Sequence, residues 1–181
     1  MKKSPVLLLI ILCFTSASFA EIITGPYLRN VTDKSIEIMW ETDKESDSLV
    51  KYGLNEKLGK TVEDPKKIKM HKVEIKNLKE DTLYHYKVVS GKDGSKNYTF
   101  KTAFFSEKPF SFAIFSDTQL NTDMMEKWDG LLKQKKLDFI VHCGDIVDDG
   151  AYDEFINAFF TPWKDILANT VVFNVMGNHD V

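Results

Sequence analysis

Apolar and polar residues alternate through much of the first half of the chain, which is typical of strands with one buried face. Ile36, Ile38 and Trp40 are spaced two residues apart, with Glu37 and Met39 between them. Further strand-like runs lie at residues 49–53, 69–75, 82–89 and 97–102, separated by turn-rich segments such as 91–94. Short strands at this spacing predict an antiparallel β-sandwich over residues 22–102.

The aromatic residues of this half are predicted to form its core, with Trp40 as the central side chain. Leu78, Thr82, Tyr84 and Tyr86 resemble the tyrosine corner of fibronectin type III domains. In such a corner a tyrosine hydroxyl bonds back to the chain near the sheet edge. The predicted sandwich is therefore fibronectin type III-like.

The pattern changes after a short polar connection at residues 103–109, and strand-like runs then alternate with helical ones. The apolar runs are residues 110–116, 137–143 and 170–176. Between the first two runs, apolar residues from Met124 to Leu132 share one helical face, with Asn121, Thr122 or Asp123 as the N-cap. This order predicts a partial α/β domain with a parallel sheet at residues 109–181.

A second helical pattern lies between the last two apolar runs and contains Tyr152, Phe155, Ile156, Phe159 and Phe160. Pro162 is expected to interrupt this pattern, because proline cannot continue a helix from within. Thr161 would then cap a new helix that begins at Pro162. The apolar stripes of both patterns are interpreted as core.

The first twenty residues have the features of a signal peptide. Lys2 and Lys3 precede a short apolar stretch, and small residues precede an expected cleavage site after Ala20. We therefore expect a secreted or periplasmic protein without membrane contact beyond this leader; the alternative is an uncleaved anchor. Cys143 is the one cysteine outside the leader, and its place in an apolar run predicts a packing role.

The composition gives no sign of nucleic-acid binding. The chain of 181 residues has a formal net charge of −3, and its lysine-rich stretches are interrupted by acidic and apolar residues. A basic stripe of the kind that contacts phosphate backbones is therefore not expected. The oligomeric state does not follow from the sequence.

Polar clusters follow each of the three apolar runs in the second half. They contain Asp117 and Gln119, then Asp145, then Asn178 and His179. Because ligands bind outside the carboxyl ends of the strands in an open parallel sheet, these side chains are expected at one edge. Oxygen and nitrogen donors together suit hard or borderline metal ions, so the pattern predicts a metal-dependent phosphoester site. The alternative is three polar turns that merely cap the sheet.

The residue types also suggest separate roles. Asp117 and Asp145 are placed to hold and bridge two cations, and Gly144 allows a sharp backbone turn beside them. Asn178 offers a neutral carbonyl oxygen. His179 could give a proton to a leaving-group oxygen or hold a phosphate oxygen.

These clusters resemble the motifs of the calcineurin-like metallophosphoesterase superfamily. Its members have Asp-x-His, Gly-Asp-x-x and Gly-Asn-His-Asp/Glu at successive strand ends, and this chain has segments 117–119, 144–148 and 177–180. A leading sandwich that contains Gly25-Pro26-Tyr27-Leu28 is similar to the purple acid phosphatases and their bacterial relatives. The resemblance implies a phosphate ester substrate and two divalent or trivalent metal ions (iron, zinc or manganese).

By the same resemblance, Asp117 would bind the first metal, Asp145 would bridge both, and Asn178 would bind the second. His179 would be the catalytic residue that assists the leaving group. Gln119 stands where the superfamily has histidine, so it is either a weaker metal ligand or a turn residue. Asp148 stands where purple acid phosphatases have the tyrosine that binds iron, which implies a colourless relative.

The superfamily's later histidines, including its Gly-His-x-His segment, have no counterpart here. The sequence is therefore interpreted as an N-terminal fragment of an exported phosphoesterase, inactive alone. Two alternatives stay open. The sandwich could be a binding or adhesion module with a vestigial catalytic half, or the chain could be a hydrolase of another type that uses one metal.

Overall fold

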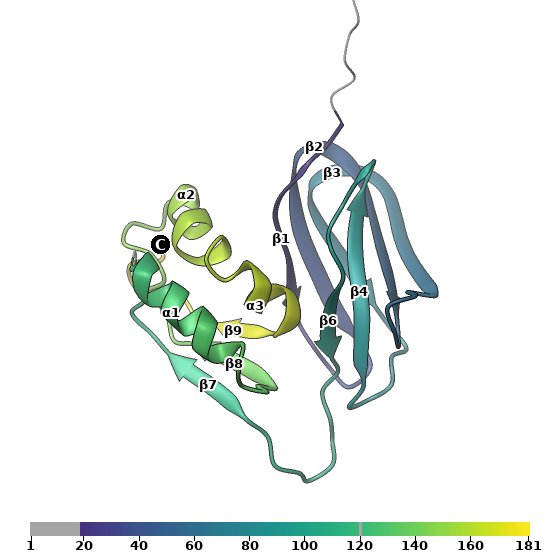
Figure 1. Ribbon diagram of the computed structural model, residues 1–181. Helices are drawn as coiled ribbons and strands as arrows, with labels where there is room; N and C mark the ends of the chain where they lie inside the picture. Colours follow the sequence, from purple (N-terminus) through teal and green to yellow (C-terminus); the bar gives the residue numbers. More distant parts are fainter. Residues whose placement is uncertain (1–18, 120) are drawn as a thin grey trace, which may run out of the picture.

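The structure is a computed structural model that describes residues 19–119 and 121–181 (Figure 1). Almost all of the expected signal peptide, residues 1–20, lies outside the described residues. No helix in the described part of the chain is long and apolar enough to cross a membrane. An antiparallel β unit comes first, followed by a small parallel sheet with helices beside it (Figure 1).

The first unit consists of strands whose pairings are all antiparallel. Its strands are β1 (Ile22–Arg29), β2 (Ile36–Gly53), β3 (Lys60–Ile75), β4 (Leu83–Ser90), β5 (Asp93–Gly94) and β6 (Tyr98–Lys101). The antiparallel architecture predicted from the alternating pattern is therefore confirmed.

Strands β2 and β3 are much longer than the sequence pattern predicted. The apolar runs 36–40 and 49–53 were expected to be separate strands, but β2 is continuous over 18 residues. Its first half pairs with β1 and its second half with β4, and the register with β3 shifts on both sides of Ser46. Such irregularities bend a strand without breaking it, so β2 passes from one layer of the sandwich to the other.

Trp40 lies at the centre of the sandwich and is completely buried, as predicted. Its ring stacks on His71 with centroids 4.8 Å apart, and its indole N–H donates to Ser90 Oγ at 2.8 Å. Tyr84 is also buried, and its hydroxyl accepts a hydrogen bond from the Lys79 N–H at 3.0 Å. This bond back to the chain has the form expected of a tyrosine corner.

The second unit contains three parallel strands in the order β7–β8–β9. Its elements are β7 (Phe112–Phe115), α1 (Thr122–Leu132), β8 (Phe139–His142), α2 (Tyr152–Phe155), the π-helix η1 (Ile156–Phe160), α3 (Lys164–Asn169) and β9 (Val172–Asn174). Asn121 caps α1 by accepting the Met124 N–H at 3.1 Å, as its side-chain type predicted. The strands are shorter than the apolar runs, and Cys143 follows β8 as an exposed residue, so its predicted packing role is wrong.

A separate short helix follows Pro162, as expected, but it does not begin at Pro162 and Thr161 is not its cap. Thr161 has helical dihedral angles and donates its N–H to the Ile156 carbonyl at 2.9 Å, as in a π-turn. The wider turn carries the chain past Pro162, whose nitrogen has no hydrogen to donate. Helix α3 then begins at Lys164, without a side-chain cap at Trp163.

Helices pack against only one of the two faces of the parallel sheet. Ala113 and Phe115 of β7 pack toward the helices, against a core that includes Trp163. Phe112 and Ile114, which alternate with them, are 48% and 60% exposed. The helices therefore cover one face of the sheet, and apolar side chains remain accessible on the other.

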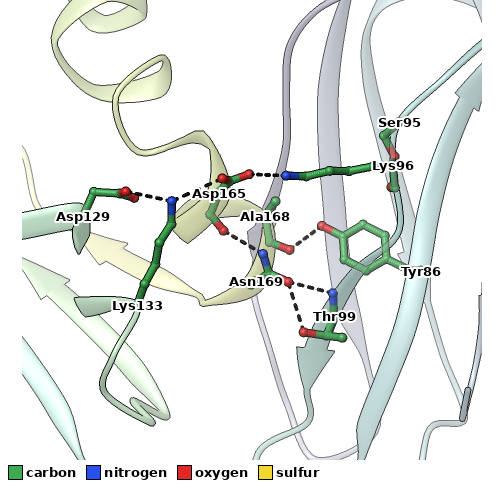
Figure 2. Close-up of polar contacts among 9 residues, drawn as sticks. All are labelled: Tyr86, Ser95, Lys96, Thr99, Asp129, Lys133, Asp165, Ala168 and Asn169. Carbon is green, nitrogen blue, oxygen red and sulfur yellow. Dashed lines mark hydrogen bonds and ion pairs between the residues drawn. The ribbon is translucent and has the colours of Figure 1, made fainter. Parts of the chain in front are cut away.

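The two units share a buried junction. The Tyr86 hydroxyl of β4 donates to the Ala168 carbonyl of α3 at 2.7 Å, in a fully buried position (Figure 2). Val171, just before β9, packs in the same apolar cluster as Trp40. Residues 22–102 therefore do not close the sandwich core by themselves.

Polar contacts extend this junction toward the surface. Figure 2 shows Asp165 of α3 between Lys96 and Lys133, at 2.8 Å and 3.2 Å. Asn169 accepts the Thr99 N–H at 2.8 Å through its side-chain oxygen. Since these lysines are largely solvated, the ion pairs orient the units more than they stabilise them.

We expect Trp40→Ala to lower the free energy of unfolding by about 3–5 kcal/mol, because it empties a fully buried site and leaves His71 without its stacking partner. Urea denaturation followed by circular dichroism measures the change. Leu54→Ala, at a residue that is 58% exposed, is the matched control and should change stability by less than about 0.5 kcal/mol. Similar effects of the two variants would contradict the core assignment.

The sandwich should lose stability in mild acid because of His71. Burial lowers the pKa of His71, and the negative charge of Asp47 offsets this only in part. The unfolded chain therefore takes up a proton first as the pH falls, so stability is full above about pH 6.5 and declines below it.

The measurement is the free energy of unfolding of the wild type and of His71→Gln at pH 7.5 and pH 5.0. We expect the decrease between the two pH values to be smaller in the variant, since glutamine does not titrate. Equal decreases would show that His71 does not contribute to the acid sensitivity.

Candidate metal site

The segments after β7 and β8 lie side by side and are joined by main-chain hydrogen bonds. The Asp117 N–H donates to the Gly144 carbonyl at 3.0 Å, and the Gln119 N–H donates to the Asp145 carbonyl at 3.1 Å. Both segments follow the carboxyl ends of adjacent parallel strands. The edge of the sheet thus brings Asp117, Gln119 and Asp145 into neighbouring backbone positions, as the sequence pattern predicted.

The segment after β9 meets the same point. The His179 N–H donates to Asp145 Oδ1 at 3.0 Å, and His179 Nδ1 donates to the Asp148 carbonyl at 2.8 Å. Gly177 lies so close that an added Cβ would come within 2.1 Å of Asp145 Oδ1. Asp145 is therefore the residue at which all three strand-end segments meet.

Several residues of these segments have left-handed backbone conformations. The φ angles are 54° at Asp117, 40° at Gln119 and 54° at Asp145, and Gly144 precedes Asp145 with φ 95°. Residues other than glycine rarely adopt such angles, which persist where the surrounding structure enforces them and cluster at functional sites. Three of the candidate ligands thus share an unusual backbone state.

The candidate side chains differ in exposure. Asp117, Asn178 and His179 are exposed, while Gln119 and Asp145 are half-buried. The Ser116 hydroxyl donates to Asp117 Oδ2. The hydrogen bond to the Asp148 carbonyl raises the pKa of His179 above its usual value, and nearby carboxylates add to the effect. A proton on His179 is therefore retained to higher pH than on an isolated histidine.

His142, at the end of β8, connects the segment after β7 with the segment after β8. It is fully buried, and its Nε2 lies 2.9 Å from Thr118 Oγ1. Its Nδ1 accepts the Gly144 N–H at 3.2 Å, so Nε2 carries the ring proton and donates it to Thr118. Burial lowers the pKa of His142, which favours this neutral form. His142 is therefore a buried histidine with both ring nitrogens hydrogen-bonded, and it ties Thr118 to the segment after β8.

Asp180 is a second residue whose role the sequence reasoning missed. It is 3% exposed, and its carboxylate accepts main-chain N–H groups from Asp145, Ile146, Val147 and Gly177. Burial by itself would raise the pKa of Asp180, but these N–H groups outweigh it and hold the pKa below its usual value. Its position directly after Asn178 and His179 was the available signal.

The donors at this edge fit part of a metal site. Asp117 and Asp145 provide carboxylates, Gln119 and Asn178 could provide amide oxygens, and one Asp145 oxygen already accepts an N–H. Within the described ranges, no group of three or more His, Cys, Asp or Glu side chains is arranged to hold a metal ion. All-oxygen donors with two carboxylates suit a single hard cation better than a closely spaced pair.

Comparison with known families finds one match for each unit. Residues 26–102 match the family described as purple acid phosphatase, N-terminal domain. Residues 110–181 match the family described as calcineurin-like phosphoesterase. No curated protein sequence matches the chain.

Two solved structures share the fold across both units. Purple acid phosphatase PPD1 from yellow lupin (Lupinus luteus) seeds aligns with a TM-score of 0.69 and 17% identity, over 87% of this chain and 36% of that one. PhoD aligns with a TM-score of 0.65 and 16% identity, over 90% of this chain and 40% of that one. The chain thus spans well under half the length of either protein. The first unit of this chain is thus similar to the purple acid phosphatase N-terminal domain, and the second is similar to the calcineurin-like phosphoesterases.

Proposed function

We propose that this chain is part of an exported, metal-dependent phosphoric ester hydrolase related to the purple acid phosphatases. The observation that carries the proposal is the meeting of three strand-end segments at Asp145, at the carboxyl edge of a parallel sheet. Ligands bind at this edge in open α/β sheets. The family matches support phosphate esters as the substrate class.

In this proposal Asp117, Asp145 and Asn178 are metal ligands, with Gln119 as a further oxygen donor. Bound iron, zinc or manganese ions would polarise a phosphate oxygen and lower the pKa of a water molecule. His179 acts as the proton donor to the leaving group. The Asp148 carbonyl engages its Nδ1 and thereby makes Nε2 the nitrogen that can exchange a proton with a substrate oxygen.

We further propose that residues 1–181 alone hydrolyse phosphate esters poorly. The reason is the donor set: two carboxylates and two amide oxygens do not offset the mutual repulsion and dehydration of two cations. The remaining donors would belong to a longer protein. The leader at residues 1–20 would direct that protein out of the cytoplasm.

The test compares residues 1–181 with the longer protein, each supplied with zinc, manganese or iron, on p-nitrophenyl phosphate and bis-p-nitrophenyl phosphate. We expect turnover from the longer protein and little from residues 1–181. In the longer protein Asp145→Ala should lower kcat/KM by more than about 100-fold. Mutating a residue that only orients a metal ligand lowers activity by less than this, so the size of the loss distinguishes a direct ligand. Gln119→His should preserve activity or tighten metal binding, since imidazole is the stronger ligand for zinc.

Asp153→Asn is the matched control, because it removes one exposed carboxylate of α2 outside the site. It should leave kcat/KM unchanged. Turnover by residues 1–181 that Asp145→Ala abolishes would show that this chain is a working enzyme. Unchanged turnover in Asp145→Ala of the longer protein would remove the basis of the proposed site.

A further inference from the structure

The carboxylate of Asp180 is enclosed by main-chain N–H groups. Its Oδ1 accepts from Ile146 at 2.7 Å and Val147 at 3.2 Å. Its Oδ2 accepts from Asp145 and Gly177, both at 2.9 Å. Three of these donors are consecutive residues of the segment after β8, and the fourth belongs to the segment after β9. One buried carboxylate therefore joins the two segments.

Three successive N–H groups converge because of the local backbone. Gly144 has φ 95° and Asp145 has φ 54°, which turns the following amides toward a common point. Concave groups of successive N–H donors of this kind bind anions. Here the anion is a side chain of the same protein. Its charge strengthens each bond relative to a neutral acceptor.

Asp145 is held from two sides by this arrangement. Its N–H is bound to Asp180, and its Oδ1 accepts the N–H of His179. Gly177 packs against it so closely that no side chain would fit there. Among the contacts of the described residues, none engages Asp145 Oδ2, so this oxygen can face a cation.

We propose that Asp180 is the positioning residue of this site. Its carboxylate holds Asp145 in the left-handed conformation and fixes the direction of the Asp145 carboxylate before any metal ion binds. The expectation that Asp180 increases metal affinity rests on the proposed function. The expectation that Asp180 fixes the Asp145 backbone does not depend on that function. Asp180 itself binds neither metal nor substrate in this proposal.

The first experiment measures amide hydrogen exchange by NMR in the full chain and in Asp180→Asn. Asparagine has the same shape, but it is uncharged and turns an NH₂ group toward N–H donors. We expect exchange at Asp145, Ile146 and Gly177 to be at least tenfold faster in Asp180→Asn. The control Asp153→Asn, which removes the same charge from α2, should leave these rates unchanged.

The second experiment titrates Mn²⁺ as a paramagnetic probe and follows line broadening at the Asp145 and His179 amides. The concentration that gives half-maximal broadening should rise at least tenfold in Asp180→Asn. Asp180→Glu keeps an anionic acceptor, so it should recover part of both the amide protection and the Mn²⁺ response. A role that is merely space-filling would not be rescued by the longer carboxylate.

The outcomes separate this proposal from the proposed function. Faster exchange in Asp180→Asn, without any Mn²⁺ broadening in the unsubstituted chain, supports the positioning role and counts against a cation site formed by residues 1–181 alone. Unchanged exchange in Asp180→Asn overturns the positioning role. If Asp180→Asn also loses protection at sandwich amides such as Val50 and Val88, the substitution has destabilised the whole chain. The Asp180→Glu variant then separates the two causes. Amide exchange at Asp145 that is as fast in Asp180→Glu as in Asp180→Asn overturns the proposal.

Discussion

Main-chain hydrogen bonding between strand-end segments is the constraint on which the second unit depends. The parallel register of β7, β8 and β9 brings three segments to one edge. At this edge their amides need acceptors, because the segments turn away from the sheet pairing. The carbonyls of Gly144 and Asp145 serve the first segment, and the Asp180 carboxylate serves the second and third. The polar residues that suggest chemistry are thus held by the same bonds that close the fold.

Sequence patterning was sufficient for the architecture because each pattern is local. Alternation in residues 22–102 and strand–helix alternation afterwards predicted the antiparallel and parallel units, and the position of Asp145 after an apolar run predicted its place at the edge. The continuity of β2 was not predictable in this way. Polar residues around Ser46 resemble a turn, and only pairing with the distant β3 makes them a strand.

The same limit applies to the site. Asp117, Gln119 and Asp145 could be placed from their neighbours in the sequence, but the roles of Asp180 and His142 could not. Asp180 acts on amides more than thirty residues earlier in the chain, and His142 bridges to Thr118 across two strands. Burial of a polar side chain is visible only in three dimensions, and so are the partners that it must find there.

The junction between the units changes how the chain can be dissected. Val171 fills the sandwich core, and the next residue begins β9, whose far end leads to Asn178 and His179. Tyr27 of β1 in turn packs on Phe160 of the π-helix, with ring centroids 5.1 Å apart. Removing either unit would expose apolar side chains of the other that are buried at the junction. The leading sandwich therefore cannot simply be replaced by an unrelated one. A chimera with a foreign sandwich would have to recreate the apolar site that Val171 fills and the hydrogen bond that the Tyr86 hydroxyl donates to the Ala168 carbonyl.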